Sequence, residues 1–171
     1  MAKQSASTLN VPEKLRVLLA CFVIPSALVL WVWVVLTSWT DLPEEFPTHW
    51  GPEGADAFGT AISFINGQSL AAAVAAGITA VVGIFNLNTG VWTSLARGLV
   101  SIGGGITAAI SIGLYLHMLR SRGLSTLAAA ELGASAGLLG AACGFLVLVV
   151  VTFLLLPKGR YPEAAEEAMP Q

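Results

Sequence analysis

A histidine set among carboxylates is the part of this sequence best suited to chemistry. His49 lies in a segment, residues 41–66, whose other ionisable groups are acidic: Asp41, Glu44, Glu45, Glu53 and Asp56. Imidazole and carboxylate groups bind Zn²⁺, and carboxylates bind Ca²⁺. We predict no metal site. The weak candidate for a set of metal ligands is His49 with Glu45 and Glu53. We favour a histidine that hydrogen-bonds to the loop backbone; the remaining alternative is sensing of pH or an external peptide.

Motifs of conventional enzymes are absent from the sequence. It contains no nucleophile elbow, P-loop, HExxH or dinucleotide fingerprint. Its long apolar stretches contain no deep acidic or basic residue of the kind that proton and ion pathways use. Cys21 and Cys143 are expected to be separate apolar side chains at different depths, and His117 a bystander near a helix end. We therefore predict a protein that is not an enzyme, with no cofactor and no nucleic-acid partner.

Four apolar stretches must position these residues: 17–39, 68–87, 95–116 and 134–157. Each approaches or exceeds the ~20 residues that cross a bilayer as a helix. Only 11% of the residues are charged and the mean hydropathy is +0.79, whereas soluble domains carry about 25% charged residues. The sequence predicts an all-α fold, an integral membrane four-helix bundle with one long, ordered extracytoplasmic loop.

The basic residues predict the orientation. One side of a four-helix layout receives Lys3, Lys14, Arg16, Arg97, Lys158 and Arg160, and the other receives only Arg120 and Arg122. Because cytoplasmic loops are enriched in Lys and Arg, both termini are expected to be cytoplasmic. The predicted segments are a cytoplasmic tail (1–12), the first transmembrane helix with the outer loop (13–66), three further transmembrane helices (67–157) and a second cytoplasmic tail (158–171).

Proline and glycine predict local features of these segments. Asn10 fits a helix N-cap, and Pro25 is expected to kink the first span. Within the loop, the prolines at 43, 47 and 52 prevent a continuous helix, and residues 60–65 are apolar enough to lie at the membrane interface or to re-enter. Ser125 or Thr126 is expected to begin a long fourth span outside the membrane.

Small residues recur at helical spacing on two of the spans. The third span contains Ser101, Gly105, Ala109 and Gly113, and the fourth contains Gly133, Gly137, Gly140 and Gly144. Helices in membranes associate through close backbone contact at such residues. We favour packing of the third span on the fourth; the alternative is a homodimer or another membrane protein held at one of these faces.

The outer loop resembles the signature of the bacterial DUF1648 family. In that family a membrane helix is followed by a segment that runs LP-x-x-hydrophobic-P-x-H-aromatic, then G-x-x-D-x-aromatic-G. The matching positions here are Pro43, Pro47, His49, Trp50, Gly54, Phe58 and Gly59. The acidic part is one residue shorter than in the family, with Ala55-Asp56-Ala57 in place of Glu-Pro-Asp-Gly. The resemblance covers residues 15–65, about a third of the chain.

The resemblance implies a bacterial plasma-membrane protein related to SdpI-type immunity proteins, which resist a secreted killing peptide. We therefore expect a non-enzymatic multi-pass protein that senses or resists an extracellular peptide or envelope stress, with the seven matching residues as its candidate recognition loop. One alternative is a structural or accessory subunit that packs through its Gly-rich faces. A further alternative is a small transporter or metal-binding protein. The expected partners are the lipid bilayer, an extracellular peptide, and a membrane protein or a second copy of the chain.

Overall fold

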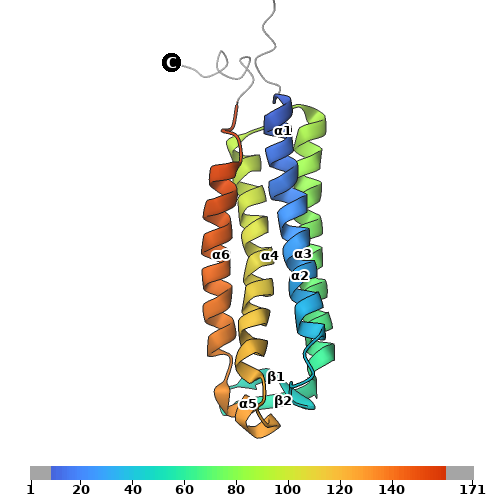
Figure 1. Cartoon of the computed structure of the whole chain (residues 1–171). Helices are drawn as coiled ribbons and strands as arrows, with labels where there is room; N and C mark the ends of the chain where they lie inside the picture. The colour runs from blue at the N-terminus through green and yellow to red at the C-terminus, as the bar shows by residue number, and fades with distance from the viewer. Residues whose placement is uncertain (1–8, 161–171) are drawn as a thin grey trace, which may run out of the picture.

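Four long helices run side by side, and a small cap closes one end of the bundle (Figure 1). The computed structural model describes residues 9–160. The helical elements are α1 (Val11–Leu18), η1 (Leu19–Val23), α2 (Ile24–Thr37), α3 (Ala61–Thr89), α4 (Ser94–Ser121), α5 (Thr126–Leu132) and α6 (Ser135–Leu155), and the strands are β1 (Glu45–Gly51) and β2 (Gly54–Thr60). Of the two predicted tails, 1–12 and 158–171, the parts at positions 1–8 and 161–171 lie outside the described residues.

Four helical segments are long and apolar enough to cross a membrane: Val11–Thr37, Ala61–Thr89, Ser94–Ser121 and Ser135–Leu155. The mostly helical fold predicted from the sequence is therefore confirmed. The two-stranded sheet at the capped end was not predicted. We call this end the hairpin end, and the opposite end, near residues 9 and 160, the terminal end (Figure 1).

The first span is one continuous helix made of α1, η1 and α2. It begins with a capping box, in which Asn10 accepts from the backbone of Glu13 and Glu13 accepts from that of Asn10. A π-helical turn, η1, lies just before Pro25. Proline lacks an N–H and its ring clashes with the carbonyl four residues earlier, and a widened turn relieves both problems.

Two helix boundaries differ from the sequence-based prediction. Residues 61–65 are the first turns of α3, because Thr60 caps that helix by accepting from the backbone N–H of Ser63; they do not form a separate re-entrant segment. Ser125 does cap a helix, but that helix is the short α5, which ends at Gly133 with φ 68°. A fresh helix, α6, begins at Ser135. The fourth span is therefore not one long helix, because a glycine with a positive φ terminates α5.

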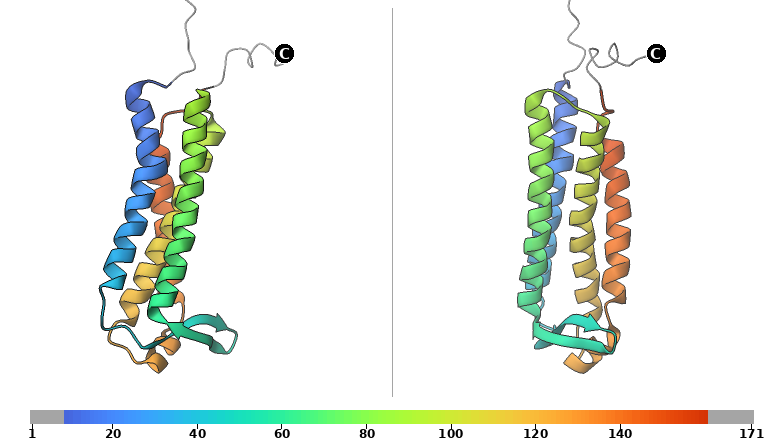
Figure 2. Two further views of the ribbon diagram at one scale, coloured as in Figure 1. Left: turned by 90° about the vertical axis from the view of Figure 1, so that its right-hand side faces the viewer. Right: turned by 180° about the vertical axis from the view of Figure 1, so that it is seen from behind.

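Helix α4 is the centre of the bundle. It packs against α2, α3 and α6, whereas α6 packs chiefly on α4. The right panel of Figure 2 shows α3 and α6 on either side of α4. In the most apolar 18-residue stretch of each helix, 50% of α4 is buried inside the molecule, against 17% of α6. Much of the surface of α6 is therefore left for another apolar environment.

Glycines bring α4 and α6 into backbone contact. A Cβ atom added at Gly113 would lie 2.9 Å from the carbonyl oxygen of Gly137, and one added at Gly140 would lie 2.8 Å from that of Ile112. Gly144 approaches the carbonyl of Ala108 in the same way, at 2.7 Å. These glycines lie inside the molecule, so their faces are not open to a second copy or another protein. Gly133 does not belong to this contact, because it ends α5 and nothing lies within 4 Å of its added Cβ.

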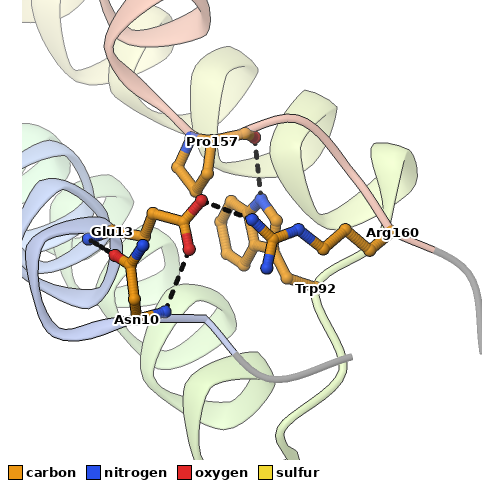
Figure 3. Close-up of polar contacts among 5 residues, drawn as sticks. All are labelled: Asn10, Glu13, Trp92, Pro157 and Arg160. Atoms are coloured by element: carbon orange, nitrogen blue, oxygen red, sulfur yellow. Dashed lines mark hydrogen bonds and ion pairs between the residues drawn. The ribbon is translucent and has the colours of Figure 1, made fainter. Parts of the chain in front are cut away.

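A buried tryptophan joins three parts of the chain at the terminal end (Figure 3). Trp92, between α3 and α4, is 1% exposed, and its indole N–H donates to the carbonyl of Pro157 at 3.0 Å. The backbone N–H of Arg160 donates to the carbonyl of Trp92 at 2.7 Å. The guanidinium of Arg160 then pairs with Glu13 of the first helix at 2.6 Å. Both ends of the described chain are thereby fastened to the α3–α4 connection.

Candidate cap at the hairpin end

The cap is built first from an antiparallel hairpin. Strands β1 and β2 pair from Glu45 with Thr60 to Gly51 with Gly54, with irregular register on both sides of His49. Pro47 has no N–H to offer the ladder, which is consistent with a local irregularity. Gly54 has φ 119°, a conformation that side chains rarely adopt. Thr60 ends β2 and also caps α3, so the hairpin continues into the membrane-type helix with no linker.

The short helix α5 completes the cap from a distant part of the sequence. The hydroxyl of Thr126 donates to the carbonyl of Glu45 at 2.9 Å, and the indole N–H of Trp50 donates to the carbonyl of Ala130 at 3.3 Å. These contacts join residues about eighty positions apart, and Figure 1 shows α5 beside the two strands. The first and third connections therefore form one structural unit.

A charged pair reinforces the same junction. The guanidinium of Arg122 contacts both carboxylate oxygens of Asp41, at 2.9 and 3.0 Å, and it lies 4.6 Å from the centre of the Trp39 ring. The backbone N–H of Gly123 donates to the carbonyl of Asp41 at 2.7 Å. The charge of Asp41 is thus matched within the cap and is not presented to a partner.

The imidazole of His117 fastens the cap to α4. Its ring meets Trp50 at 5.1 Å and 85°, and Phe46 at 5.2 Å and 84°, both edge-on, and Phe64 of α3 lies 6.2 Å away. His117 is 4% exposed. Neither of its ring nitrogens has a hydrogen-bond partner among the residues that the structure describes. The sequence analysis treated this histidine as a bystander, whereas the structure places it at the centre of an aromatic cluster.

His49 and Trp50, adjacent in the sequence, have different surroundings. The side chain of His49 is 69% exposed, and its Nδ1 lies 2.5 Å from a carboxylate oxygen of Asp56 across the hairpin. Trp50 is half-buried beneath the hairpin. The partner of His49 is therefore a side chain, and not the loop backbone that we favoured from the sequence.

The candidate metal set is not assembled. Within residues 9–160, no group of three or more His, Cys, Asp or Glu side chains is arranged to hold a metal ion. Glu45 begins β1 and Glu53 lies in the turn, at opposite ends of the strand that carries His49. The distance along an extended strand separates their carboxylates.

The other residues of the candidate recognition loop serve the shape of the hairpin. Pro43 and Pro47 are buried, and Gly54 forms the turn. A Cβ added at Gly59 would touch Thr48 at 3.4 Å. Phe58, by contrast, is 49% exposed. The loop thus presents His49 and Phe58 to the surroundings and uses its prolines and glycines to hold them.

Comparison with known proteins adds no relative to this description. No family model matches the chain, and neither a curated protein nor a solved structure matches it at a significant level. The resemblance of the loop to DUF1648 therefore stays a prediction.

The exposed charge of the hairpin is negative. Glu44, Glu45 and Glu53 are exposed, and none of them has an ion-pair partner among the described residues. We call these three residues together with Phe58 the acidic hairpin surface. Exposed carboxylates without an ion-pair partner, together with an exposed aromatic ring on the same part of the cap, suit a ligand that is both cationic and apolar.

The sequence analysis missed the role of α5 and of His117. One signal was available for α5: the third connection contains Arg122, a cation on the side of the membrane where the acidic loop was expected. The aromatic cluster around His117 had no signal, because its members come from β1, α3 and α4.

Proposed function

We propose that this chain is a non-enzymatic, multi-pass protein of the bacterial plasma membrane whose cap recognises an extracellular cationic peptide, as an immunity or signalling protein does. In this proposal the four long helices span the bilayer, the termini are cytoplasmic and the hairpin end faces outward. The observation that carries the proposal is the acidic hairpin surface, held on a cap that is tied to α3, α4 and α5.

Charge supports a cationic ligand. Three exposed carboxylates lack an ion-pair partner within residues 9–160, while Arg122, a cation at the cap, is paired with Asp41. Opposite charges raise the rate of encounter and select against anionic partners. Phe58 supplies an apolar contact in the same hairpin, and membrane-active peptides combine basic and apolar residues.

Rigidity supports recognition over simple tethering. A binding surface held in one conformation loses little entropy when it binds. Here β2 runs directly into α3, and β1 is bonded to α5 through Thr126 and Trp50. A ligand at the hairpin would therefore act on elements that continue into the helices.

The test is binding of a fluorescent cationic amphipathic peptide to the full chain in nanodiscs of zwitterionic lipid, at physiological salt. Charges more than about 8 Å apart are screened under these conditions, so only residues near the contact should matter. We expect Glu53→Lys to weaken binding at least about fivefold. The matched control is Glu131→Lys, which makes the same charge change at an exposed position of α5 and should have a smaller effect.

The difference between these variants in peptide binding should also appear as a difference in protection of cells. Expression of the chain in a peptide-sensitive bacterium should raise the peptide concentration needed for killing, and Glu53→Lys should remove this protection at unchanged protein abundance. Equal binding and equal protection by the parent and Glu53→Lys would contradict recognition at the acidic hairpin surface.

A second function is favoured by the surface of α6. This helix packs chiefly on α4, and its side chains at 138, 139, 146, 147 and 154 are all more than 60% exposed. An accessory subunit that packs against a larger membrane protein would use this face, and not the buried glycines. Co-purification that is lost with Leu139→Ser and Leu146→Ser would favour this alternative.

A further inference from the structure

A pocket of about 240 Å³ lies beneath the cap, between α3, α4 and α6. Trp50 of the hairpin lines it on the side of the cap, Phe64 and Gln68 come from α3, His117 and Gly113 from α4, and Gly137 from α6. Leu138, which is 69% exposed, also lines the pocket. The pocket therefore reaches the outer surface of the helices, which in the proposed orientation is the hydrocarbon of the outer leaflet.

The pocket contains an unusual polar group. His117 lines it and is 4% exposed, yet neither ring nitrogen has a hydrogen-bond partner among residues 9–160. A buried polar group without a partner costs free energy, so such groups are normally satisfied by a neighbour or a ligand. Gln68 adds a half-buried amide to the same wall. Two side chains with hydrogen-bonding groups thus line a space whose other walls are aromatic, aliphatic or glycine.

Charge restricts what could enter. Among the described residues, no Asp, Glu, Lys or Arg lines the pocket. An ionised group there would be desolvated without a counter-charge, which is unfavourable. A neutral hydroxyl or carbonyl, in contrast, can exchange hydrogen bonds with imidazole and amide groups.

We propose that this pocket binds a neutral amphiphile dissolved in the bilayer, with an apolar body and a hydroxyl or carbonyl group that hydrogen-bonds to His117. Its apolar body lies against Phe64, Gly113 and Gly137, and its polar group lies under Trp50. This inference rests on the membrane placement in the proposed function and does not depend on a peptide ligand at the acidic hairpin surface.

The test uses the full chain in nanodiscs and an alkyne-tagged hexadecanol that carries a photoreactive diazirine. Labelled peptides are mapped by mass spectrometry. We expect saturable labelling at pocket-lining residues such as Trp50 and Gly137, and competition by unlabelled hexadecanol. The corresponding alkane should label less, because it cannot bond to His117, and the corresponding carboxylic acid should also label less, because no cation lines the pocket.

The variant that isolates the hydrogen bond is His117→Phe. Phenylalanine keeps a ring against Phe46 and Trp50 but removes both nitrogens, so the fold is expected to survive with an equal or higher melting temperature. Hexadecanol labelling should require about 5- to 10-fold more probe, the size of one neutral hydrogen bond. The matched control is Ser111→Ala. The hydroxyl of Ser111 is also buried on α4 and has no partner among the described residues, but Ser111 does not line the pocket. This variant should leave labelling unchanged.

Two outcomes would overturn the inference. Labelling spread evenly over the exposed residues of α6, with alcohol and alkane alike, would mean ordinary lipid contact. Equal labelling of the parent and His117→Phe would mean that the imidazole binds nothing. Peptide binding is measured on the same samples. Peptide binding without pocket-specific labelling by hexadecanol contradicts this inference alone. Pocket-specific labelling without peptide binding contradicts only peptide recognition.

Discussion

The indole of Trp50 stands edge-on to the imidazole of His117, with ring centres 5.1 Å apart and planes at 85°. The two residues belong to the hairpin and to α4, and their contact is the link between the cap and the central helix of the bundle. The same indole donates its N–H to Ala130 of α5. One side chain therefore joins three elements, whereas its neighbour His49 points to the surroundings.

This arrangement predicts effects of very different size on the free energy of unfolding for two adjacent residues. Trp50→Ala should lower the free energy of unfolding by about 2–4 kcal/mol, because it removes a large half-buried ring and leaves a cavity over His117. His49→Ala, at an exposed ion pair, should cost less than about 1 kcal/mol. Thermal unfolding of both variants in one detergent is the measurement, and equal destabilisation by the two would contradict the assignment of their environments.

Sequence patterns predicted the helices because a long apolar helix leaves a long, simple signal. Runs of about 20 apolar residues predict their own length and type, and Asn10 predicted the start of the first helix. The hairpin was not predictable from the sequence, because Pro47 and the Gly residues break the alternation of apolar and polar residues in its strands. Its inner face is also completed by α5, which is distant in the sequence. A cluster such as Phe46, Trp50 and His117 depends on tertiary contacts that no local spacing encodes.

The glycine contact was partly predictable. Spacing placed Gly137, Gly140 and Gly144 on one face of a helix, and the structure brings that face against α4. The spacing also included Gly133, since periodicity alone does not show where a helix begins. Gly133 has a positive φ and ends α5, which separates it from the other three glycines.

A bulky residue in that contact should separate the two helices. Gly140→Leu would place its Cβ 2.8 Å from the carbonyl oxygen of Ile112 and more atoms beyond it, so α6 must move away from α4. We expect a loss of several kcal/mol of stability in detergent, seen as a large fall in melting temperature. Leu154→Ala is the control, because Leu154 is 74% exposed. Similar melting temperatures for the two variants would show that the helices do not touch at Gly140.

The tryptophan at the terminal end makes a separable contribution. Trp92→Phe keeps an aromatic ring in the buried site but removes the N–H that donates to Pro157. Leaving that carbonyl without its donor should cost about 1–2 kcal/mol, and backbone amide exchange near residues 158–160 should rise. Trp31→Phe, at a half-exposed position, serves as the comparison. Unchanged exchange in Trp92→Phe would mean that the hydrogen bond does not hold the C-terminal segment.

The account depends most directly on which side of the membrane the cap occupies. One cysteine at a time, at Glu53 in the hairpin turn or at Asn88 near the terminal end, both exposed, can be introduced into a Cys143→Ala background, whose remaining cysteine, Cys21, is buried. Intact cells are then treated with a membrane-impermeant maleimide. The account predicts that Glu53→Cys is labelled in intact cells, and that Asn88→Cys is labelled only after the membrane is permeabilised. Labelling of Asn88→Cys but not Glu53→Cys in intact cells would place the cap in the cytoplasm and contradict recognition of an external peptide.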